Sequence, residues 1–424
     1  MLQVFKFGGA SICNADAVRN LVSILNNYRG HKLIVVLSAI GKSTNALEAM
    51  LQAARNRNSD TYHLLFEEFK SFHFQISKEL FTDDDKQINS RINNLFEQLH
   101  MAMHDGCNED YDFHYDQTVC FGELLSTTIV SAYLSKSGID HVLIDARDYV
   151  ITDNHHRSAN VDWTSSCDRI RGLNLKNSSL TMTQGFISAS KENVGTTLGR
   201  EGSDYTAAIF AYCLQADEVV IWKDVEGLLN ADPKRFDETI KLEHISYAEA
   251  IELAYYGATV IHPKTIKPLQ NKRIPLKVQS FANPKAKASL ISHLAEFDTS
   301  VPSFIVKDNQ MLVSISPHDF SFMTETNLHN IFGVLSKLNI HVNLFQTSAI
   351  SLSFCADFNQ HQLDRLFEEL HHGYALRFNT GLQLLTIRHY TEADLKRMSL
   401  NKPVLLEQRS RTTVQLVLKT KASQ

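Results

Sequence analysis

The chain has 424 residues, 43% of them hydrophobic, and its 42 Lys and Arg against 47 Asp and Glu leave a formal net charge of −5. This length suffices for two or three domains, and the absence of a long Lys/Arg cluster argues against a nucleic-acid partner. No apolar run approaches the length of a membrane span and the start, MLQVFKFGG, does not resemble a signal peptide, so we expect a cytoplasmic protein.

The first part of the chain alternates strand-like apolar runs with helical patterns. A strand over 2–7 enters a tight turn, a helix follows over 15–28, and a strand over 32–38 is buried on both faces. Helical spacing over 60–104 indicates two long helices. Later strands are predicted at 141–146, 180–188, 218–222 and 274–280, and later helices at 204–215 and 246–256. This alternation indicates an α/β sandwich with a mainly parallel sheet, which we assign to residues 1–297.

The pattern changes after the polar segment 295–303. Predicted strands at 311–316, 341–346, 350–356 and 374–379, with helices at 325–338 and 360–371, have the β-α-β-β-α-β order of the ferredoxin-like fold. A shortened second copy follows, with strands at 382–390, 403–408 and 412–419 and a helix at 391–399. We therefore expect two small α+β modules, residues 303–380 and 381–424.

The cysteines and histidines give no metal or disulfide signal. The six cysteines, at positions 13, 107, 120, 167, 213 and 355, include no CxxC pair, so we expect reduced, buried thiols. The histidine pairs at 155–156 and 371–372 are adjacent in sequence and therefore point in different directions. Since HExxH spacing is also missing, we expect surface histidines and no metal site.

Three glycine turns follow strand-like runs. They are KFGGAS (6–11), SAIGKSTN (38–45) and GREGSD (199–204). Glycine lets backbone N–H groups approach a ligand, and such turns converge at the carboxyl edge of an open sheet, where anions bind. None matches the GxxxxGK[ST] phosphate loop, which excludes an ordinary P-loop enzyme. Together with Lys6, Arg200 and Asp204 they predict an anion site.

These turns belong to an ordered set of segments that resembles the motifs of aspartate kinases, members of the amino acid kinase family. The set is KFGGAS, LSAIGKSTN, FGELLST (121–127), TQGFIS, TTLGREGSDYTA (196–207), IWKDVEGLLNADPK (221–234) and GATVIHPKT (257–265). The tail resembles the paired ACT modules of these enzymes, so the resemblance covers essentially the whole chain.

The resemblance implies a fold, an activity and partners. The fold is the amino acid kinase three-layer sandwich followed by two ACT modules. The activity is transfer of the γ-phosphoryl group of ATP to the β-carboxylate of L-aspartate, giving 4-phospho-L-aspartate, the first step of lysine, threonine and methionine biosynthesis. Mg²⁺ would accompany ATP, an amino-acid effector would bind the ACT modules, and the chain would form a homodimer or a dimer of dimers.

The chemistry also follows from the residue types. A carboxylate, with a pKa of about 4, is already an ionised nucleophile at neutral pH, so no catalytic base is needed. The obstacle is electrostatic, because an anion must approach a triphosphate. By the resemblance, Lys6 neutralises the transferring phosphoryl group, and Asp204 holds Lys6 and organises the Mg²⁺–ATP end. The N–H groups of Gly8, Gly9 and Ala10 would cradle the phosphates.

The acceptor needs groups for two carboxylates and one ammonium. Arg200 suits a carboxylate because its planar fork binds two oxygens, and Glu123 suits the ammonium. Hydroxyls that could orient the substrate are those of Ser38, Thr44 and Ser203. The competing structural roles are a helix-end acid for Glu123, helix caps for Ser38 and Thr44, and a structural ion pair for Arg200.

The nucleotide end departs from the family pattern. The residues implied there are Lys223, Asp224, Lys234 and Thr259. Many members have Ser or Thr at the position of Lys223 and often Lys at that of Thr259, for which Lys264 is a candidate substitute. Further departures are Ala10, Glu201, Glu226 and Leu229, the last in place of a Tyr near the adenine. They indicate a divergent branch or a weakened enzyme.

The tail departs as well. Members that sense lysine commonly carry acids where this chain has Asn343 and Ala349, which tells against a conventional lysine site. Asp319 and Glu325, in the loop SPHDFSFMTE, could compensate, or this loop could be a solvated connection.

Two interpretations compete for the whole chain. One is an active kinase, and the other is a catalytically weak sensor whose ACT tail binds an amino acid and regulates a partner. The intact set Lys6, Glu123, Arg200 and Asp204 favours the kinase. A kinase for another amino acid is disfavoured, because such enzymes lack this tail and the FGELLST segment.

Overall fold

The computed structural model describes residues 1–81, 85–175, 179–258, 261–400 and 402–419. These residues form two compact units. The first consists of Met1–Leu228, Lys241–Ile251 and Val260–Phe297, and the second of Leu229–Ile240, Glu252–Thr259 and Asp298–Gln424. The segments 229–240 and 252–258 thus pack with the tail, although in sequence they lie inside the predicted first domain.

The first unit is built on a large sheet. Its strands are β1 (Leu2–Phe7), β2 (Lys32–Leu37), β3 (Val142–Ile144), β5 (Leu180–Gln184), β8 (Glu218–Lys223), β11 (His244–Ser246), β12 (Leu276–Ser280) and β13 (Ser289–Ser292). Their order is β11-β13-β12-β8-β1-β2-β5-β3, and all neighbours run parallel except β12 and β13. The predicted α/β fold with a mainly parallel sheet is confirmed.

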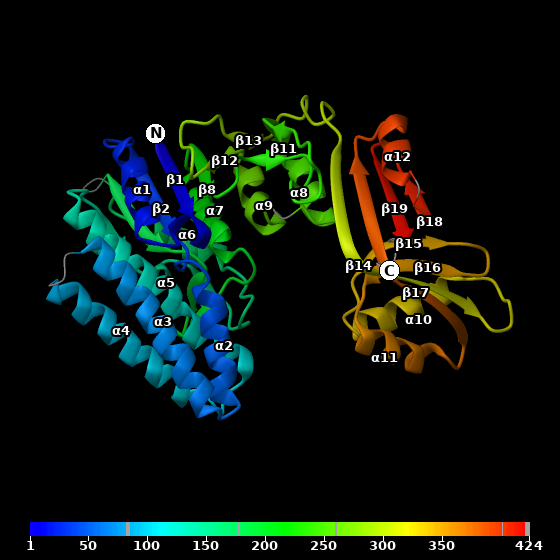
Figure 1. Ribbon diagram of the computed structural model, residues 1–424, viewed down its shortest axis with the longest axis horizontal. Helices are drawn as coiled ribbons and strands as arrows, with labels where there is room; N and C mark the ends of the chain where they lie inside the picture. The colour runs from blue at the N-terminus through cyan, green and yellow to red at the C-terminus, as the bar shows by residue number, and fades with distance from the viewer. Residues whose placement is uncertain (82–84, 176–178, 259–260, 401, 420–424) are drawn as a thin grey trace. The chain divides into compact units, whose positions relative to one another are not determined.

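Helices cover both faces of this sheet. The described helices up to residue 272 are α1 (Ala15–Asn26), α2 (Ser43–Arg55), α3 (Ser59–Leu80), α4 (Lys86–Asp105), α5 (Tyr111–Lys136), α6 (Trp163–Arg171), α7 (Gly202–Leu214), α8 (Tyr247–Tyr256), which continues into the second unit, and α9 (Pro263–Lys272). Phe5 and Phe7 of β1 share a buried core with α1 to α5. Because side chains alternate along a strand, Lys6 points to the opposite face, where α7 packs on β1, β2 and β8. Helices α2 to α5 lie side by side (Figure 1).

Helix α5 differs from what its sequence led us to expect. Its 26 residues are long and apolar enough, by length and composition, to cross a membrane, whereas we expected no such segment. However, 72% of the apolar window is buried inside the protein, and the helix carries the buried polar residues Asp116, Glu123 and Thr127. These are the features of a core helix.

A three-stranded sheet borders the large one, with the order β4 (Ile151–Thr152), β6 (Ile187–Ser190) and β7 (Gly195–Thr197). The single strand predicted over 180–188 is therefore two strands, β5 and β6, in different sheets. They are separated at Gly185 and Phe186, and Phe186 adopts a left-handed backbone conformation with φ of 68° that a strand cannot accommodate.

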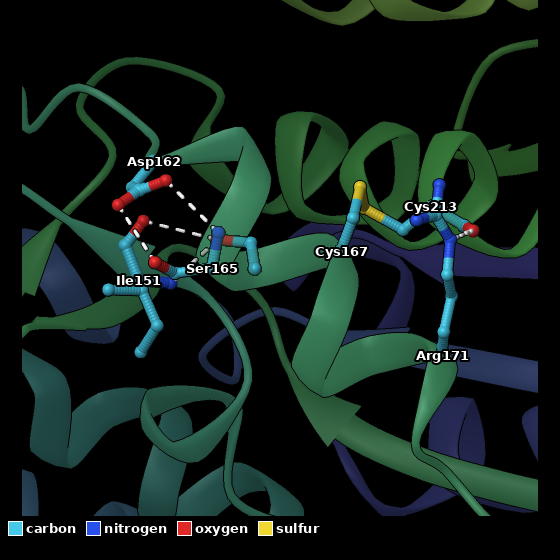
Figure 2. The surroundings of a disulfide bond; sticks show 7 residues. Ile151, Asp162, Ser165, Cys167, Arg171 and Cys213 are labelled. Atoms are coloured by element: carbon cyan, nitrogen blue, oxygen red, sulfur yellow. Dashed lines mark hydrogen bonds between the residues drawn. A yellow bond between two sulfur atoms is a disulfide. The ribbon is translucent and has the colours of Figure 1, made fainter.

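Helices α6 and α7 are joined by a disulfide bond between Cys167 and Cys213, whose Cα atoms lie 4.8 Å apart (Figure 2). The prediction that all six cysteines are reduced thiols is therefore wrong. The pair is separated by 46 residues, so it becomes adjacent only when the two helices pack. Next to it, the Arg171 guanidinium donates to the Cys213 carbonyl at 3.2 Å.

The described tail of the second unit, residues 298–400 and 402–419, contains one six-stranded sheet and three helices. Its elements are β14 (Ser303–Pro317), α10 (Glu325–Lys337), β15 (Val342–Thr347), β16 (Leu352–Asp357), α11 (Gln360–Leu370), β17 (Tyr374–Arg388), α12 (Glu392–Ser399), β18 (Val404–Arg409) and β19 (Thr413–Lys419). The strand order is β15-β16-β14-β17-β19-β18. The order of elements from β14 to β17 confirms the predicted ferredoxin-like arrangement. Two short strands of the connecting segments, β9 (Leu228–Leu229) and β10 (Lys241–Leu242), complete the described strands.

The two long strands β14 and β17 run through both modules. The second half of β14 pairs with residues 374–379, next to α10 and α11, whereas residues 303–307 pair with 384–388. The strands predicted separately at 374–379 and 382–390 are thus one strand. We propose that residues 303–307 belong to the second module, together with α12, β18 and β19.

Candidate active site

A cavity of about 450 Å³ lies in the first unit where β1, β2 and β8 end. The turns that follow β1 and β2 lie together because parallel strands end at the same edge of a sheet. The third glycine turn follows β7 of the smaller sheet and leads into α7, which packs on β1, β2 and β8. The cavity wall includes the predicted site residues Lys6, Gly9, Ser38, Thr44, Glu123, Arg200, Ser203, Asp204 and Lys223.

The first two glycine turns are in direct backbone contact. The Gly41 amide donates to the Gly9 carbonyl at 3.0 Å, and the Ser38 amide donates to the Phe7 carbonyl at 3.1 Å. A Cβ atom at Gly9 would lie 2.6 Å from the Gly41 carbonyl oxygen, a distance at which a carbon atom and an oxygen atom clash. Gly9 is therefore required for the two turns to meet.

Two ammonium groups share one buried carboxylate at this edge. Lys6 Nζ lies 2.6 Å from Asp204 Oδ1, and Lys223 Nζ lies 3.6 Å from Oδ2. Burial by itself would raise the pKa of Asp204, but the two ammonium groups outweigh it and hold that pKa below its usual range. The cluster of one carboxylate and two ammonium groups has a net positive charge and faces the cavity.

Glu123 lies in the middle of α5, so the interpretation as a helix-end acid is wrong. Its side chain is buried, and Oε1 accepts a hydrogen bond from the Ala39 amide at 3.3 Å. Oε2 has no hydrogen-bond partner among the residues that the structure describes. Burial raises the pKa of Glu123 to about 8, because the charged form is poorly solvated there. A cationic ligand would supply the missing partner.

Ser38, Thr44 and Arg200 do not fill the structural roles that their positions in the sequence allowed. Helix α2 begins at Ser43 after Lys42, which makes no side-chain cap, so neither Ser38 nor Thr44 caps it. Arg200 has no ion-pair partner within the described part of the chain. All three side chains therefore remain candidates for ligand contacts.

Five predicted residues lie outside the cavity wall or outside the described chain. Gly8 and Ala10 flank Gly9 in the first turn, and Asp224 is exposed next to Lys223. Lys234 is exposed and belongs to the second unit. Thr259 lies outside the described residues. Its candidate substitute, Lys264, donates to the Ser158 hydroxyl at 3.1 Å.

Two further wall residues, Tyr115 and Arg157, were not predicted from the sequence. The Arg157 guanidinium pairs with Glu48 at 2.9 Å and lies 4.3 Å from the Tyr115 ring centroid. Arg157 has φ of 63°, which is unusual for a residue with a side chain. It comes from a polar loop with no motif, and only the fold brings it to the cavity.

The fold defines an α/β protein with a charged cavity at one edge of its parallel sheet, and comparison with known proteins identifies its family. A sequence model of the amino acid kinase family matches residues 1–280. The lysine-sensitive aspartokinase 3 of Escherichia coli is 30% identical over 360 residues, which are 84% of this chain and 78% of that protein. The chain therefore belongs to the amino acid kinase family, in its aspartokinase branch.

Two other matches extend the comparison. The crystal structure of E. coli aspartokinase III in complex with aspartate and ADP superimposes with a TM-score of 0.83 and 26% identity, covering 99% of this chain and 96% of that one. The chloroplastic bifunctional aspartokinase/homoserine dehydrogenase 2 of Arabidopsis thaliana is 29% identical over 90% of this chain. The chain spans only 42% of the length of that bifunctional relative.

Proposed function

We propose that this chain is an aspartate kinase, which transfers the γ-phosphoryl group of ATP to the β-carboxylate of L-aspartate. The observation that carries the proposal is the charge pattern of one cavity. The Lys6–Asp204–Lys223 cluster suits a polyphosphate, while Glu123 and Arg200 suit an ammonium and a carboxylate. A relative whose crystal structure superimposes on 99% of this chain, E. coli aspartokinase III, was solved with aspartate and ADP.

In the proposed acceptor site, Glu123 binds the ammonium of aspartate through the oxygen that has no described protein partner. Arg200 binds a carboxylate, and the hydroxyls of Ser38, Thr44 and Ser203 fix its orientation. The charges of the site match those of a dicarboxylic amino acid.

In the proposed transfer step, a β-carboxylate oxygen attacks the γ-phosphorus. A new P–O bond forms, the bond from the γ-phosphorus to the β,γ-bridging oxygen breaks, and ADP leaves with that electron pair. Lys6 and Lys223 offset the charge on the phosphoryl oxygens, and Asp204 keeps the two ammonium groups in place. The N–H groups of Gly8, Gly9 and Ala10 assist at the phosphates. No proton is transferred, because the attacking carboxylate is already ionised.

Magnesium fits this site as a companion of the nucleotide. Among the described residues, no group of three or more His, Cys, Asp or Glu side chains could hold a metal ion. Mg²⁺ commonly binds through substrate phosphates and one or two carboxylates, and Asp224, with Asp204, is the candidate here. When bound, it would neutralise phosphate charge. The nucleotide-binding roles that the resemblance implies for Lys234 and Thr259 stay predictions.

The direct test is a hydroxamate assay with ATP, Mg²⁺ and, in parallel, aspartate, glutamate and N-acetylglutamate. We expect acyl-phosphate formation with aspartate and not with glutamate or N-acetylglutamate. Product with another acceptor but not with aspartate would refute the proposal. Binding of aspartate without turnover would instead favour the sensor interpretation.

Acid pH should weaken aspartate binding through Glu123. The pKa of this residue is raised to about 8, so below that pH the free enzyme must lose a proton before the carboxylate can pair with the ammonium. We expect kcat/KM for aspartate to rise about tenfold per pH unit from about pH 6 and to level off near pH 8. The kcat/KM for ATP serves as the internal control. Glu123→Gln should abolish the rise, and an unchanged slope in that variant would assign it to another group.

In the tail, the surroundings of Asn343 bear on how the protein would respond to lysine. Asn343 is buried, and its amide donates to Gln310 at 2.9 Å and to Asp357 at 3.1 Å, while it accepts from Lys307 at 2.9 Å. Both polar atoms of this uncharged side chain thus bond to neighbouring residues of the tail, so Asn343 offers an effector neither a charge nor an unused polar atom.

We predict that lysine inhibits this enzyme poorly, although the E. coli relative is lysine-sensitive. With Asn343 engaged internally and Ala349 apolar, the ε-ammonium of lysine would lack a carboxylate partner. Threonine has no side-chain ammonium, so the missing carboxylate should weaken its binding less than that of lysine. Titration of both amino acids at fixed aspartate and ATP measures the difference. Strong inhibition by sub-millimolar lysine would show that Asp319, Glu325 or another acid takes over.

We also propose a cytoplasmic homodimer in which the tail carries the contact. The exposed apolar side chains Phe320, Phe322 and Phe345 in the tail support this, since such groups often mark interfaces. Sedimentation equilibrium of the full chain tests it, and a monomer at micromolar concentration would contradict it.

A further inference from the structure

One buried carboxylate near the cavity takes no part in the proposed phosphoryl transfer. Asp116 lies on α5 two helical turns before Glu123, and its side chain is 0% exposed. Residues seven apart share a face of a helix, so α5 directs both carboxylates toward the same side. Asp116 is not part of the cavity wall, whereas its neighbour Tyr115 is.

Asp116 gathers three donors from two separate segments. The Thr197 hydroxyl donates to Oδ1 at 2.6 Å, and the Arg157 amide lies 3.2 and 3.1 Å from the two oxygens. His156 Nδ1 lies 2.8 Å from Oδ2. Both carboxylate oxygens therefore hold the loop at 156–157 against the end of β7.

Both segments lead directly to arginines of the cavity. Thr197 is the last residue of β7, three residues before Arg200. The loop residue Arg157 itself lines the cavity, and its guanidinium pairs there with Glu48 at 2.9 Å and with Asp112 at 3.4 Å. The two segments also touch, because a Cβ on Gly199 would lie only 3.0 Å from the Arg157 carbonyl oxygen, and Gly199 has φ of 77°. A shift of either segment would thus move the Gly199–Arg200 turn.

We propose that Asp116 is a positioning residue that sets Arg157 and Arg200 for binding of the acceptor's carboxylates. It acts through the backbone at Arg157 and through Thr197, without touching the substrate. This inference rests on the proposed function and assigns the acceptor site a second arginine.

The test compares Asp116→Asn with Asp168→Asn, the same chemical change at an exposed position of α6. Asn keeps the shape but replaces one acceptor oxygen by an NH2 group and removes the negative charge, so it cannot accept from all three donors as the carboxylate does. Hydrogen bonds to charged groups are typically worth about one to two factors of ten, so we expect KM for aspartate to rise about tenfold or more. KM for ATP should stay within about twofold, as should both constants of Asp168→Asn.

A second variant covers the case in which Asp116→Asn does not fold. Thr197→Val removes only the 2.6 Å contact and keeps the carboxylate. We expect a smaller rise in KM for aspartate, about threefold to tenfold, again without a change for ATP. Circular dichroism and melting temperature establish that each variant is folded.

A purely structural role would appear differently. A lowered melting temperature with unchanged KM for aspartate, or an equal loss for aspartate and ATP, would overturn the inference. If the wild-type chain forms no acyl phosphate from aspartate, the proposed function fails. If wild type is active and folded variants keep the wild-type KM, only the positioning role fails.

Discussion

Lys6→Ala is expected to lower kcat by two to three factors of ten, with little change in KM for aspartate. The Lys6 ammonium sits 2.6 Å from Asp204 at the end of β1 and faces the cavity beside the glycine turn. Its charge is needed most when negative charge moves between ADP and the acceptor, and an interaction made mainly in the transition state raises kcat rather than affinity. Loss of one such group typically costs about 3–4 kcal/mol.

Steady-state kinetics with varied aspartate and varied ATP measures both effects. Lys32→Ala, at the exposed start of the neighbouring strand, is the matched control and should behave as wild type. A folded Lys6→Ala protein that keeps half of its turnover would refute the role of Lys6. Because Asp204 stays paired with Lys223 in the variant, we expect it to fold.

Arg200→Ala is expected to raise KM for aspartate by roughly one to two factors of ten and to leave KM for ATP nearly unchanged. The guanidinium has no ion-pair partner in the described part of the chain, so its removal should act on a ligand and not on a structural contact. Hydrogen bonds to a charged group are worth about 1.5–3 kcal/mol each, which sets this range.

Arg200→Lys refines this test, because lysine keeps the charge but not the two-pronged geometry. We expect it to recover only part of the loss. The exposed Arg91→Ala on α4 is the control for a general charge effect. A melting temperature that falls in Arg200→Ala while KM for aspartate stays constant would indicate a structural role.

Helices and strands with a clear pattern of apolar residues could be predicted from the sequence. Those that form mainly because they pack against other segments could not. Strands β1, β2 and β8 are buried, branched runs and were predicted nearly to the residue. Helix α6 is short and polar, and α9 carries Pro268 in its interior, so neither shows a clear pattern. The left-handed Phe186 could not be foreseen either, because that conformation favours glycine.

The residues of the candidate site divide in the same way into those with a local sequence pattern and those without one. Lys6, Arg200 and Asp204 could be predicted because they stand beside glycine turns at strand ends, where backbone chemistry leaves a visible pattern. Arg157 and Asp116 could not be predicted, because the roles proposed for them depend on contacts between α5 and a polar loop distant in sequence. The Cys167–Cys213 bond was missed for the same reason.

The intertwined course of the chain limits how its parts can be exchanged. The backbone passes from one unit to the other after residues 228, 240, 251, 259 and 297. The excursions are anchored in the tail, since the Phe304 amide donates to the Asn230 carbonyl at 2.7 Å and Arg388 pairs with Glu252 at 3.4 Å. A gene truncated before Ser303 would therefore encode a protein whose residues 229–240 and 252–258 have lost their packing partners. For the same reason, moving the second unit to another protein would require transferring three separate stretches of sequence together, because the tail alone lacks the segments that pack with it.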